Sequence, residues 1–556
     1  MAGKKRDHAP PQPQARGPVY ADIDAFRREV VALHQAIFKH NQRRINASVS
    51  GYSAAFRRYE REYARGVRSY RRRATVSELD RALSRADVVY VGDYHTLAQA
   101  QRSFLRLLRR LPHDRPVTVA LEFVQGKYQR SIDAFLAGQI DEATFLRSIR
   151  HSAQTGFGSW PSFAAIFEMA RERGYRVIGI DSPGRGARSL EQRDRYAARR
   201  LIQARRAHPD ALLMVLAGEL HVAPQHLPEA VAREAAALGR AVGPPLRALI
   251  LYQNCEKIYA ALVERGLEHD VEIVQVARGQ YCLINTPPIV CQQSFLNWLY
   301  ADEDGEQIEA PEHTFKEYVR IIASFFELPM GDALDEVELN TVVDLSFLQR
   351  LRRRGDFSSH DMKMIKRQVL NSESYYIPRA KMVYLGNLSV NHVSEEATHF
   401  LRHVCADIED PKLLVDAFYA RCIEEALGFL GSKVINHKRK RPGLQYFRRV
   451  RASSTATPRE KELARLVLKH ATMEQGRKVR GMNEVYECDA DMFNAVTHVL
   501  GYRLGDKMYY GLLDGVLRKA EVRDLFFDTF EEEGTALSTY LYLQARTAGV
   551  RSPTPL

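Results

Sequence analysis

Between residues 85 and 255, short apolar runs alternate with longer segments in which apolar residues recur every three or four positions. The short runs are rich in Val, Leu and Ile, which is typical of strands buried on both faces. The longer segments are amphipathic and predict helices that cover a sheet. We expect strands at 87–91, 117–121, 176–180, 212–217 and 246–252, and helices at 97–111, 128–137, 161–173, 189–207 and 228–238. The alternation predicts an α/β fold with a central parallel sheet flanked by helices.

Outside this region the pattern divides the chain further. A last β-rich run lies at 272–284, and one strand-like segment at 374–385 interrupts a long series of amphipathic helical segments. The expected parts are a disordered, Pro- and Gln-rich tail (1–18), a basic helical extension (19–84), the α/β domain (85–300), an acidic linker (301–312) and a mainly helical domain (313–556). The sequence does not indicate a role for the last part.

Charge adds a possible class of partner but no specific one. The chain of 556 residues has 81 Lys and Arg against 68 Asp and Glu, a formal net charge of +13. Such a balance attracts anionic molecules, and nucleic acid stays an alternative partner on this ground. However, the basic runs at 71–73 and 438–441 have no recognisable nucleic-acid module beside them. We interpret both as solvated charge, the second within a surface loop at 437–458.

Cysteine usage and the N-terminus bear on the compartment. The six cysteines have no Cys-x-x-Cys and no regular spacing, which favours free thiols in a reducing compartment. No apolar run follows the basic N-terminus, and no run of about 18 apolar residues occurs. We therefore expect no signal peptide, no transmembrane segment and a cytoplasmic location.

Candidate chemistry lies at the ends of four expected strands. Two of them run directly into Gly-x-x-His, which places Asp93 with His95 and Glu219 with His221. The other two carry acids at their ends, Glu122 and Asp181. Because the carboxyl ends of parallel strands meet at one edge of a sheet, these side chains should gather there. Two imidazoles and four carboxylates in one place predict a reaction centre or a metal site.

The order of these motifs resembles the ChaN-like family. The matching segments are 88–95 (VVYVGDYH), 120–123 (ALEF), Gln129 with 135–138, Trp160, 177–183 (VIGIDSP) and 217–222 (AGELHV). The wider group is similar to the erythromycin esterases and the TIKI metalloproteases, which share two Gly-x-x-His motifs on an α/β fold. The resemblance covers roughly residues 85–255.

What the resemblance implies differs between branches of the group. ChaN-like proteins are associated with haem binding and iron uptake, the TIKI branch with metal-dependent peptide cleavage, and the esterase branch with hydrolysis by a histidine base. By position, His95 and His221 match the paired histidines, and Glu122 matches the acid after the second strand. The first motif usually reads Gly-Glu-x-His, whereas this chain has the shorter Asp93.

Our first hypothesis is a hydrolase-like enzyme that acts on a small molecule or peptide with a divalent metal ion (Mn, Zn or Co). Imidazoles can bind a metal ion or act as a general base, and carboxylates can ligate the ion or orient an imidazole ring. Glu122 follows an apolar strand, so we expect dry surroundings to raise its pKa and let it activate water or protonate the leaving group. The expected metal ligands are His95, His221, Asp93, Glu122 and Asp181, and the expected catalytic residues are His95, His221, Glu122, Asp93 and Glu219.

Two alternatives stay open. In one, the same strand ends hold haem or iron without turnover, with Tyr94 or Tyr128 as a phenolate ligand. In the other, the chain is an interaction scaffold in which the basic helices matter most and the site is vestigial. Whether the chain is an enzyme or a carrier, the loop after Asp181 could bind an anionic group of its ligand through Arg185 and Arg188. The oligomeric state is open as well.

One further polar pattern lies in the helical region. Glu396, His399 and His403 recur at spacings of three and four and share a helical face, and His392 precedes them. Histidines four residues apart can share a metal ion, but the segment lacks the central Glu of a zincin helix. We therefore interpret it as a solvated polar face.

Overall fold

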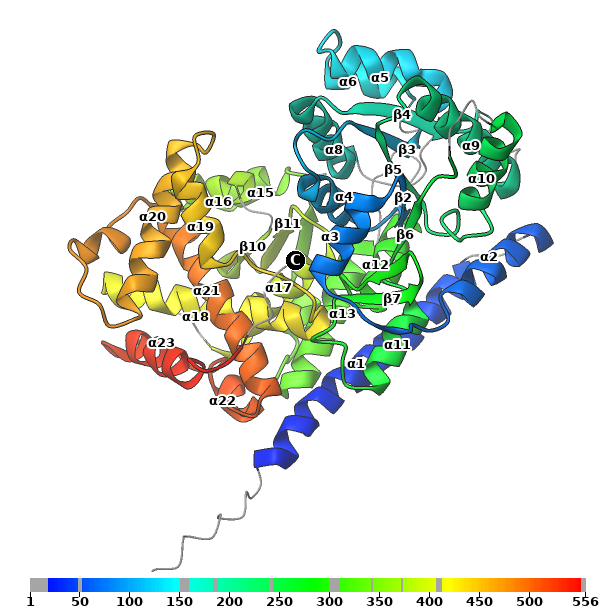
Figure 1. Cartoon of the computed structure of the whole chain (residues 1–556). Coiled ribbons are helices and arrows are strands. Elements are labelled where there is room, and N and C mark those ends of the chain that lie inside the picture. Colours follow the sequence, from blue (N-terminus) through cyan, green and yellow to red (C-terminus); the bar gives the residue numbers. More distant parts are fainter. Residues whose placement is uncertain are drawn as a thin grey trace, which may run out of the picture.

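The computed structural model describes residues 19–48, 53–150, 160–183, 189–239, 244–299, 310–341, 344–371, 374–406 and 413–551. Figure 1 shows an α/β half beside a mainly helical half, and both views show the long helix α1 (Val19–Ser48) running along the side of the molecule. The expected tail and the first nine residues of the expected linker (301–309) lie outside the described residues.

The α/β half is built on one sheet with the strand order β1-β7-β8-β6-β2-β5-β3-β4. All neighbours from β8 to β4 are parallel, whereas β7 and β1 run antiparallel to their neighbours. The predicted parallel α/β fold is thereby confirmed. The strands are β1 (Arg72–Arg73), β2 (Val88–Asp93), β3 (Val117–Gln125), β4 (Arg176–Asp181), β5 (Leu212–Gly218), β6 (Ala248–Gln253), β7 (Ile273–Ala277) and β8 (Gln280–Leu283).

Helices cover both faces of this sheet, which is why its central strands are mostly apolar. In β2, Val89 and Val91 point into one core while Val88 and Tyr90 point into the other. The first face is covered by α3 (Val76–Arg85), α4 (Ala98–Arg110), α5 (Gln129–Leu136), α6 (Glu142–Ser148) and α8 (Trp160–Arg173). The second is covered by α2 (Ala54–Gly66), α9 (Leu190–Ala207), α10 (Leu227–Leu238) and α11 (Glu256–Glu264).

The helical half has a core of its own and a small sheet. The strand-like segment 374–385 forms the antiparallel pair β10 (Ser374–Ile377) and β11 (Met382–Leu385), and β9 (Glu338–Thr341) lies parallel to β11. The helices are α12 (Pro288–Leu299), α13 (Ala310–Phe326), α14 (Ala333–Glu336), α15 (Phe347–Arg354), α16 (Ser359–Asn371), α17 (Val390–Cys405), α18 (Leu414–Ile435), α19 (Leu444–Ala452), α20 (Pro458–Met473), α21 (Ala490–Leu513), α22 (Lys519–Asp524) and α23 (Thr535–Arg546). The closely packed pair α18 and α21 lies at the centre of this half (Figure 1).

The N-terminal extension packs against both halves. Phe26, Val30 and Ile37 of α1 are buried in the same core as the helices of the C-terminal half. The second part of the extension reaches the sheet, because Arg72 and Arg73 form the edge strand β1 and pair with β7. Both side chains are exposed, as expected for this basic run.

The expected surface loop at 437–458 is wrong. Residues Leu444–Ala452 form α19, and His437, Lys438 and Arg439 are buried. The Lys438 ammonium donates to the carbonyls of His269 (3.1 Å) and Val271 (2.9 Å). Because carbonyls and acids from neighbouring elements satisfy these charges, the basic segment can lie inside the protein.

The expectations for the cysteines and for membrane-spanning segments can be compared with the structure. All six cysteines are free thiols, as predicted. Among the helices of the described ranges, none combines the length and the apolar composition that crossing a bilayer requires.

Candidate functional site

The two Gly-x-x-His motifs lie side by side at the carboxyl end of the sheet. β2 and β5 are parallel neighbours, and their register pairs Gly92 with Ala217 and Asp93 with Gly218. His95 follows the end of β2 and His221 follows the end of β5. The neighbouring strand β3 carries Glu122, so strand pairing alone brings the three side chains to one edge.

The glycine of each motif makes room for the other motif. A Cβ atom at Gly92 would lie 3.3 Å from the Cβ of Glu219. A Cβ atom at Gly218 would lie 3.1 Å from His95 Nε2 and 3.4 Å from Glu122 Oε2. These spacings are tighter than ordinary van der Waals contact, so the absent side chains allow His95 and Glu122 to approach the backbone of β5.

His95 is oriented by Asp93. Its Nδ1 lies 2.9 Å from Asp93 Oδ2, and the other oxygen of Asp93 accepts a hydrogen bond from the Gln101 amide. Asp93 is therefore fixed by two donors, with Nδ1–H of His95 as one of them. His95 Nε2 lies 4.0 Å from Glu122 Oε2, and the side chain is 23% exposed. The imidazole thus presents its second nitrogen to the site with access to solvent.

His221 is held in the same way by an aspartate from another element. Its Nδ1 lies 2.6 Å from Asp194 Oδ1, while the Tyr59 hydroxyl donates to the other oxygen of Asp194. Its Nε2 lies 3.5 Å from Glu122 Oε1. Burial lowers the pKa of His221, but the negative charges of Glu122 and Asp194 outweigh it, and the pKa is raised.

Glu122 accepts from two donors that the sequence did not reveal as partners. The Gly218 N–H donates to Oε2 at 2.6 Å, and the Arg193 guanidinium pairs with Oε1. Arg193 also lies 3.1 Å from Asp181, which therefore joins the site through the arginine. Burial lowers the pKa of Arg193, but Glu122 and Asp181 raise it overall. We call His95, Glu122, Arg193, Asp194 and His221 the histidine site.

Glu219 lies beside the histidine site with different neighbours. Burial and the nearby charge of Glu256 raise its pKa to about 7, against a hydrogen bond from Tyr63 that lowers it. Among the acids that the sequence brought forward, Glu219 therefore exchanges its proton near neutral pH.

The remaining predicted residues lie elsewhere or outside the described part. Tyr94 packs against the core of the helical half, and Tyr128 packs against the core on the first face of the sheet. Lys127 Nζ lies 4.8 Å from the centre of the Tyr128 ring. Arg185 and Arg188 lie outside the described residues.

Three members of this environment were not found from the sequence. Arg193 and Asp194 lie near the start of α9, the helix that follows β4, so an Arg-Asp pair near that helix start was the available signal. Tyr59 comes from α2, and 135 residues separate it from Asp194. No local pattern marks it.

The expected metal ligands do not fit a metal ion well. The three acids among them, Asp93, Glu122 and Asp181, each accept from a protein donor, and Arg193 already supplies positive charge between the last two. Within the described ranges, two groups of three side chains have ligand atoms within 4.8 Å of one another, and the histidine site is not among them. They are His40, His313 and Glu317, and Glu395, Glu425 and His498.

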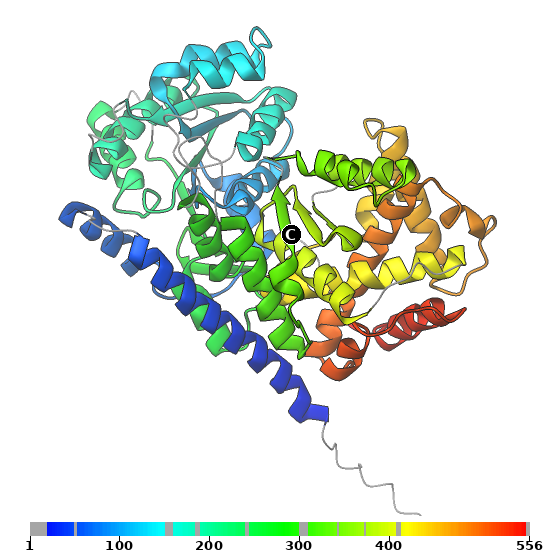
Figure 2. The same cartoon turned by 180° about the vertical axis from the view of Figure 1, so that it is seen from behind.

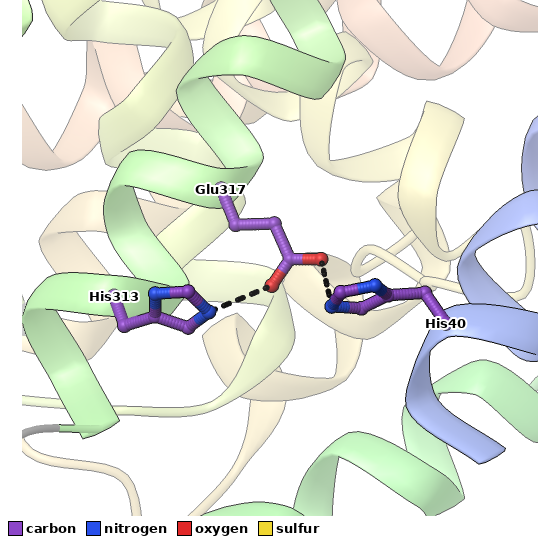
Figure 3. A group of neighbouring side chains, drawn as sticks. All are labelled: His40, His313 and Glu317. Atoms are coloured by element: carbon purple, nitrogen blue, oxygen red, sulfur yellow. Dashed lines mark ion pairs between the residues drawn. The ribbon is translucent and has the colours of Figure 1, made fainter. Parts of the chain in front are cut away.

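Figure 3 shows the first of these groups, in which the Glu317 carboxylate lies between two imidazoles. Its oxygens lie 3.5 Å from His40 Nε2 and 3.9 Å from His313 Nε2, which joins α1 to α13. Arg44 pairs with the same carboxylate at 3.4 Å, and the side chains of His40 and His313 are 44% and 56% exposed. This arrangement is that of a surface ion-pair group.

A comparison with family models finds one match. Residues 79–193 match the family described as haem-binding uptake, Tiki superfamily, ChaN. The matched segment begins in α3 and ends at Arg193, so it includes Asp93, His95 and Glu122 but not His221. Comparisons with curated proteins and with solved structures find no match. The predicted resemblance is confirmed over this segment, and the parallel sheet is consistent with it.

Proposed function

We propose that the histidine site is a hydrolytic centre that cleaves an ester or peptide bond with a histidine base. The observation that carries this proposal is the pair of Asp–His contacts, Asp93–His95 and Asp194–His221. The two imidazoles follow neighbouring strands and both approach Glu122. A carboxylate on one ring nitrogen fixes the tautomer and makes the other nitrogen a better proton acceptor.

His95 is the proposed general base. With Nδ1–H donated to Asp93, its Nε2 has a lone pair for the proton of a water molecule, and its partial exposure gives water access. The oxygen of that water forms a bond to the carbonyl carbon of the substrate while His95 takes up the proton. The carbonyl oxygen becomes an oxyanion in this step.

His221 is the proposed acid partner. Its raised pKa keeps the imidazolium populated near neutral pH, so it can stabilise developing negative charge and give a proton to the departing alcohol or amine. The bond from the carbonyl carbon to that group then breaks. Arg193 holds Glu122 and Asp181 in place, and Glu219 is a candidate second proton carrier. Because the acids fit a metal ion poorly, the proposed steps use none.

The test is turnover of p-nitrophenyl esters and short chromogenic peptides by the full chain. We expect His95→Ala to lower kcat/KM by about 100-fold or more, as loss of a general base does. His208→Ala is a matched control, because His208 precedes β5 at the opposite edge of the sheet. It should leave both activity and Tm unchanged. Equal activity of wild type and His95→Ala would contradict the proposal.

Haem binding is a second candidate, favoured by the description of the matching family as haem-binding and by the partly exposed imidazole of His95. Asp93 on its Nδ1 would strengthen Nε2 as an axial ligand to iron. Titration with hemin should then give a Soret band near about 400 nm that His95→Ala loses and Tyr94→Phe keeps. A Soret band lost only in Tyr94→Phe would assign the iron to the phenolate. The absence of a band in wild type would exclude haem binding and leave hydrolysis as the remaining candidate function.

A further inference from the structure

The helical half contains a large cavity that the histidine site does not use. Its volume is about 1720 Å³, and its walls come from α16, β10, α17, α18 and α21. The polar face of α17 that the sequence indicated as solvated is one of these walls, and that expectation is wrong. Glu395, Glu396 and His399 are 3%, 4% and 7% exposed. A helix with buried acids on the face toward a cavity needs partners there.

The histidines of this face do not meet each other. His399 lies 3.2 Å from Glu396 on the same helix, and its ring fills the space over Gly428 of α18. His403 pairs instead with Glu424 of α18 at 3.3 Å. A metal ion shared by His399 and His403 is therefore not the arrangement that the helices adopt.

A different set of side chains converges in the same cavity. Glu395 comes from α17, Glu425 from α18 and His498 from α21, and their ligand atoms lie within 4.8 Å of one another. His498 Nδ1 lies 2.9 Å from Glu425 Oε2. Three separate helices thus contribute one oxygen or nitrogen ligand each.

A second observation concerns a buried carboxylate oxygen of this set. Glu395 Oε1 is buried, and no donor among the described residues forms a hydrogen bond to it. A buried carboxylate oxygen without a donor is costly, and protein structures normally satisfy such atoms with a donor, water or a metal ion. The same holds for Oε2 of the adjacent Glu396.

Two arginines hold the other oxygens of the two acids. Arg439 lies 2.8 Å from Glu395 Oε2, and Arg421 lies 2.7 Å from Glu425 Oε1. Each guanidinium holds one oxygen, which leaves Glu395 Oε1 without a hydrogen bond from the described residues and Glu425 Oε2 in contact with His498. This is the role that outer hydrogen-bond partners have around metal ligands. Arg439, one of the buried basic residues 437–439, thus has a partner within this group.

We propose that Glu395, Glu425 and His498 bind a divalent transition-metal ion in this cavity. Carboxylate oxygens and an imidazole nitrogen together suit Mn²⁺, Fe²⁺ or Zn²⁺ better than Mg²⁺ or Ca²⁺, which prefer oxygen alone. Three protein ligands leave coordination positions open to water, and the volume of the cavity accommodates a small organic molecule beside the ion. The site is separate from the histidine site and does not depend on its proposed function.

The experiment measures metal binding by the full chain. Protein stripped with EDTA is reloaded with Mn²⁺, Zn²⁺ or, without oxygen, Fe²⁺, and the metal content and Kd are measured by mass spectrometry and calorimetry. Wild type should hold about one equivalent of at least one of these ions. His498→Ala and Glu395→Gln should each weaken that binding by about 100-fold or more, since loss of a ligand costs at least as much as loss of its outer partner.

Two matched controls use histidines outside the proposed set. His403→Ala removes an imidazole from the same cavity, and His313→Ala removes one from the group in Figure 3. Both should keep the ion. Glu395→Gln leaves Arg439 without its ion pair and can fail to fold, so Tm is measured for each variant. His498→Ala then decides the question, because its side chain is 47% exposed and its removal leaves Glu425 paired with Arg421.

The proposal is overturned by any of three results. Wild type could bind none of the three ions, or His498→Ala could bind as tightly as wild type. Alternatively, the ion could be lost in His313→Ala or in His95→Ala while His498→Ala keeps it. The last result would move the metal to α13 or to the histidine site.

Discussion

Arg193 sets the charge balance of the histidine site. It is the guanidinium that contacts both Glu122 and Asp181, and its side chain is only 11% exposed. Two carboxylates this close repel each other in a medium of low dielectric unless a cation lies between them. The arginine therefore stabilises the fold and fixes the orientation of Glu122 toward both histidines.

We expect Arg193→Met to destabilise the protein by about 3 kcal/mol, since two buried acids lose the cation that contacts both of them. Thermal and chemical unfolding would measure the loss, and hydrolytic turnover should fall with it. Arg199→Met is the control, because Arg199 lies on the exposed face of the same helix and donates to a carbonyl within it. Equal stability of the two variants would refute this role of Arg193.

At the residue scale, the sequence predicts the site residues that are positioned by the strands of the sheet. His95, Glu122 and His221 follow or end parallel neighbours, so the register of β2, β3 and β5 brings them together without further information. Arg193, Asp194 and Tyr59 come from helices, and their reach depends on how α9 and α2 pack on the sheet. That packing is tertiary, and no spacing in the chain encodes it locally.

At the scale of elements, α18 and α21 pack so closely that glycine is required between them. A Cβ atom at Gly505 would lie 2.4 Å from the carbonyl oxygen of Ala426. At Gly501 it would lie 2.7 Å from the carbonyl oxygen of Cys422. The close approach also brings Glu425 and His498 within reach of each other, so the cavity depends on it.

Gly505→Ala tests this packing, because close packing and open space predict opposite signs for the change in the free energy of unfolding. In an open helix, alanine in place of glycine stabilises by about 0.5–1 kcal/mol. Here we expect a loss of about 1–3 kcal/mol, because the added methyl group must push two backbones apart. Gly443→Ala is the control, since a Cβ atom there would have no neighbour within 4 Å. A stabilised Gly505→Ala variant, measured by Tm, would show that the helices can separate at no cost.

The elements that the sequence misjudged share one physical cause. The periodic strands and helices between residues 85 and 255 were predicted well, because burial on a sheet leaves a clear apolar pattern. The polar face of α17 and the basic residues 437–439 were assigned to solvent from their charge. In the folded chain, distant acids, carbonyls and arginines satisfy these charges, and composition does not reveal such partners.

At the scale of the whole molecule, a buried group of histidines joins the two halves. His34 of α1 stacks on His437 after α18, with ring centres 5.5 Å apart, and His269 before β7 lies tilted against His437, with ring centres 4.5 Å apart. His34 Nε2 lies 2.8 Å from the carbonyl oxygen of Val434, and Lys438 and Glu268 lie nearby. The N-terminal helix, the sheet and the helical half thus meet at imidazoles that are buried rather than solvated.

We expect acid to destabilise the contact that these histidines form between the two halves. Burial lowers the pKa of His34 to about 4 and also lowers that of His437, so both rings are neutral in the folded protein at pH 7. The unfolded chain takes up these protons near pH 6.5. Stability is therefore fully present above pH 6.5 and is lost as pH falls toward 4, by about 3 kcal/mol for His34 alone.

His34→Gln isolates this contribution, because the glutamine amide can still donate to the carbonyl of Val434 but does not titrate. We expect the fall in Tm between pH 7.5 and pH 5 to be smaller in His34→Gln than in wild type. His113→Gln, at an exposed histidine, should show the full wild-type fall. An identical pH dependence in His34→Gln would mean that other groups cause the acid sensitivity. A smaller fall would instead locate the pH-sensitive contact at the junction of α1 with both halves, where burial disfavours the charged form of both imidazoles.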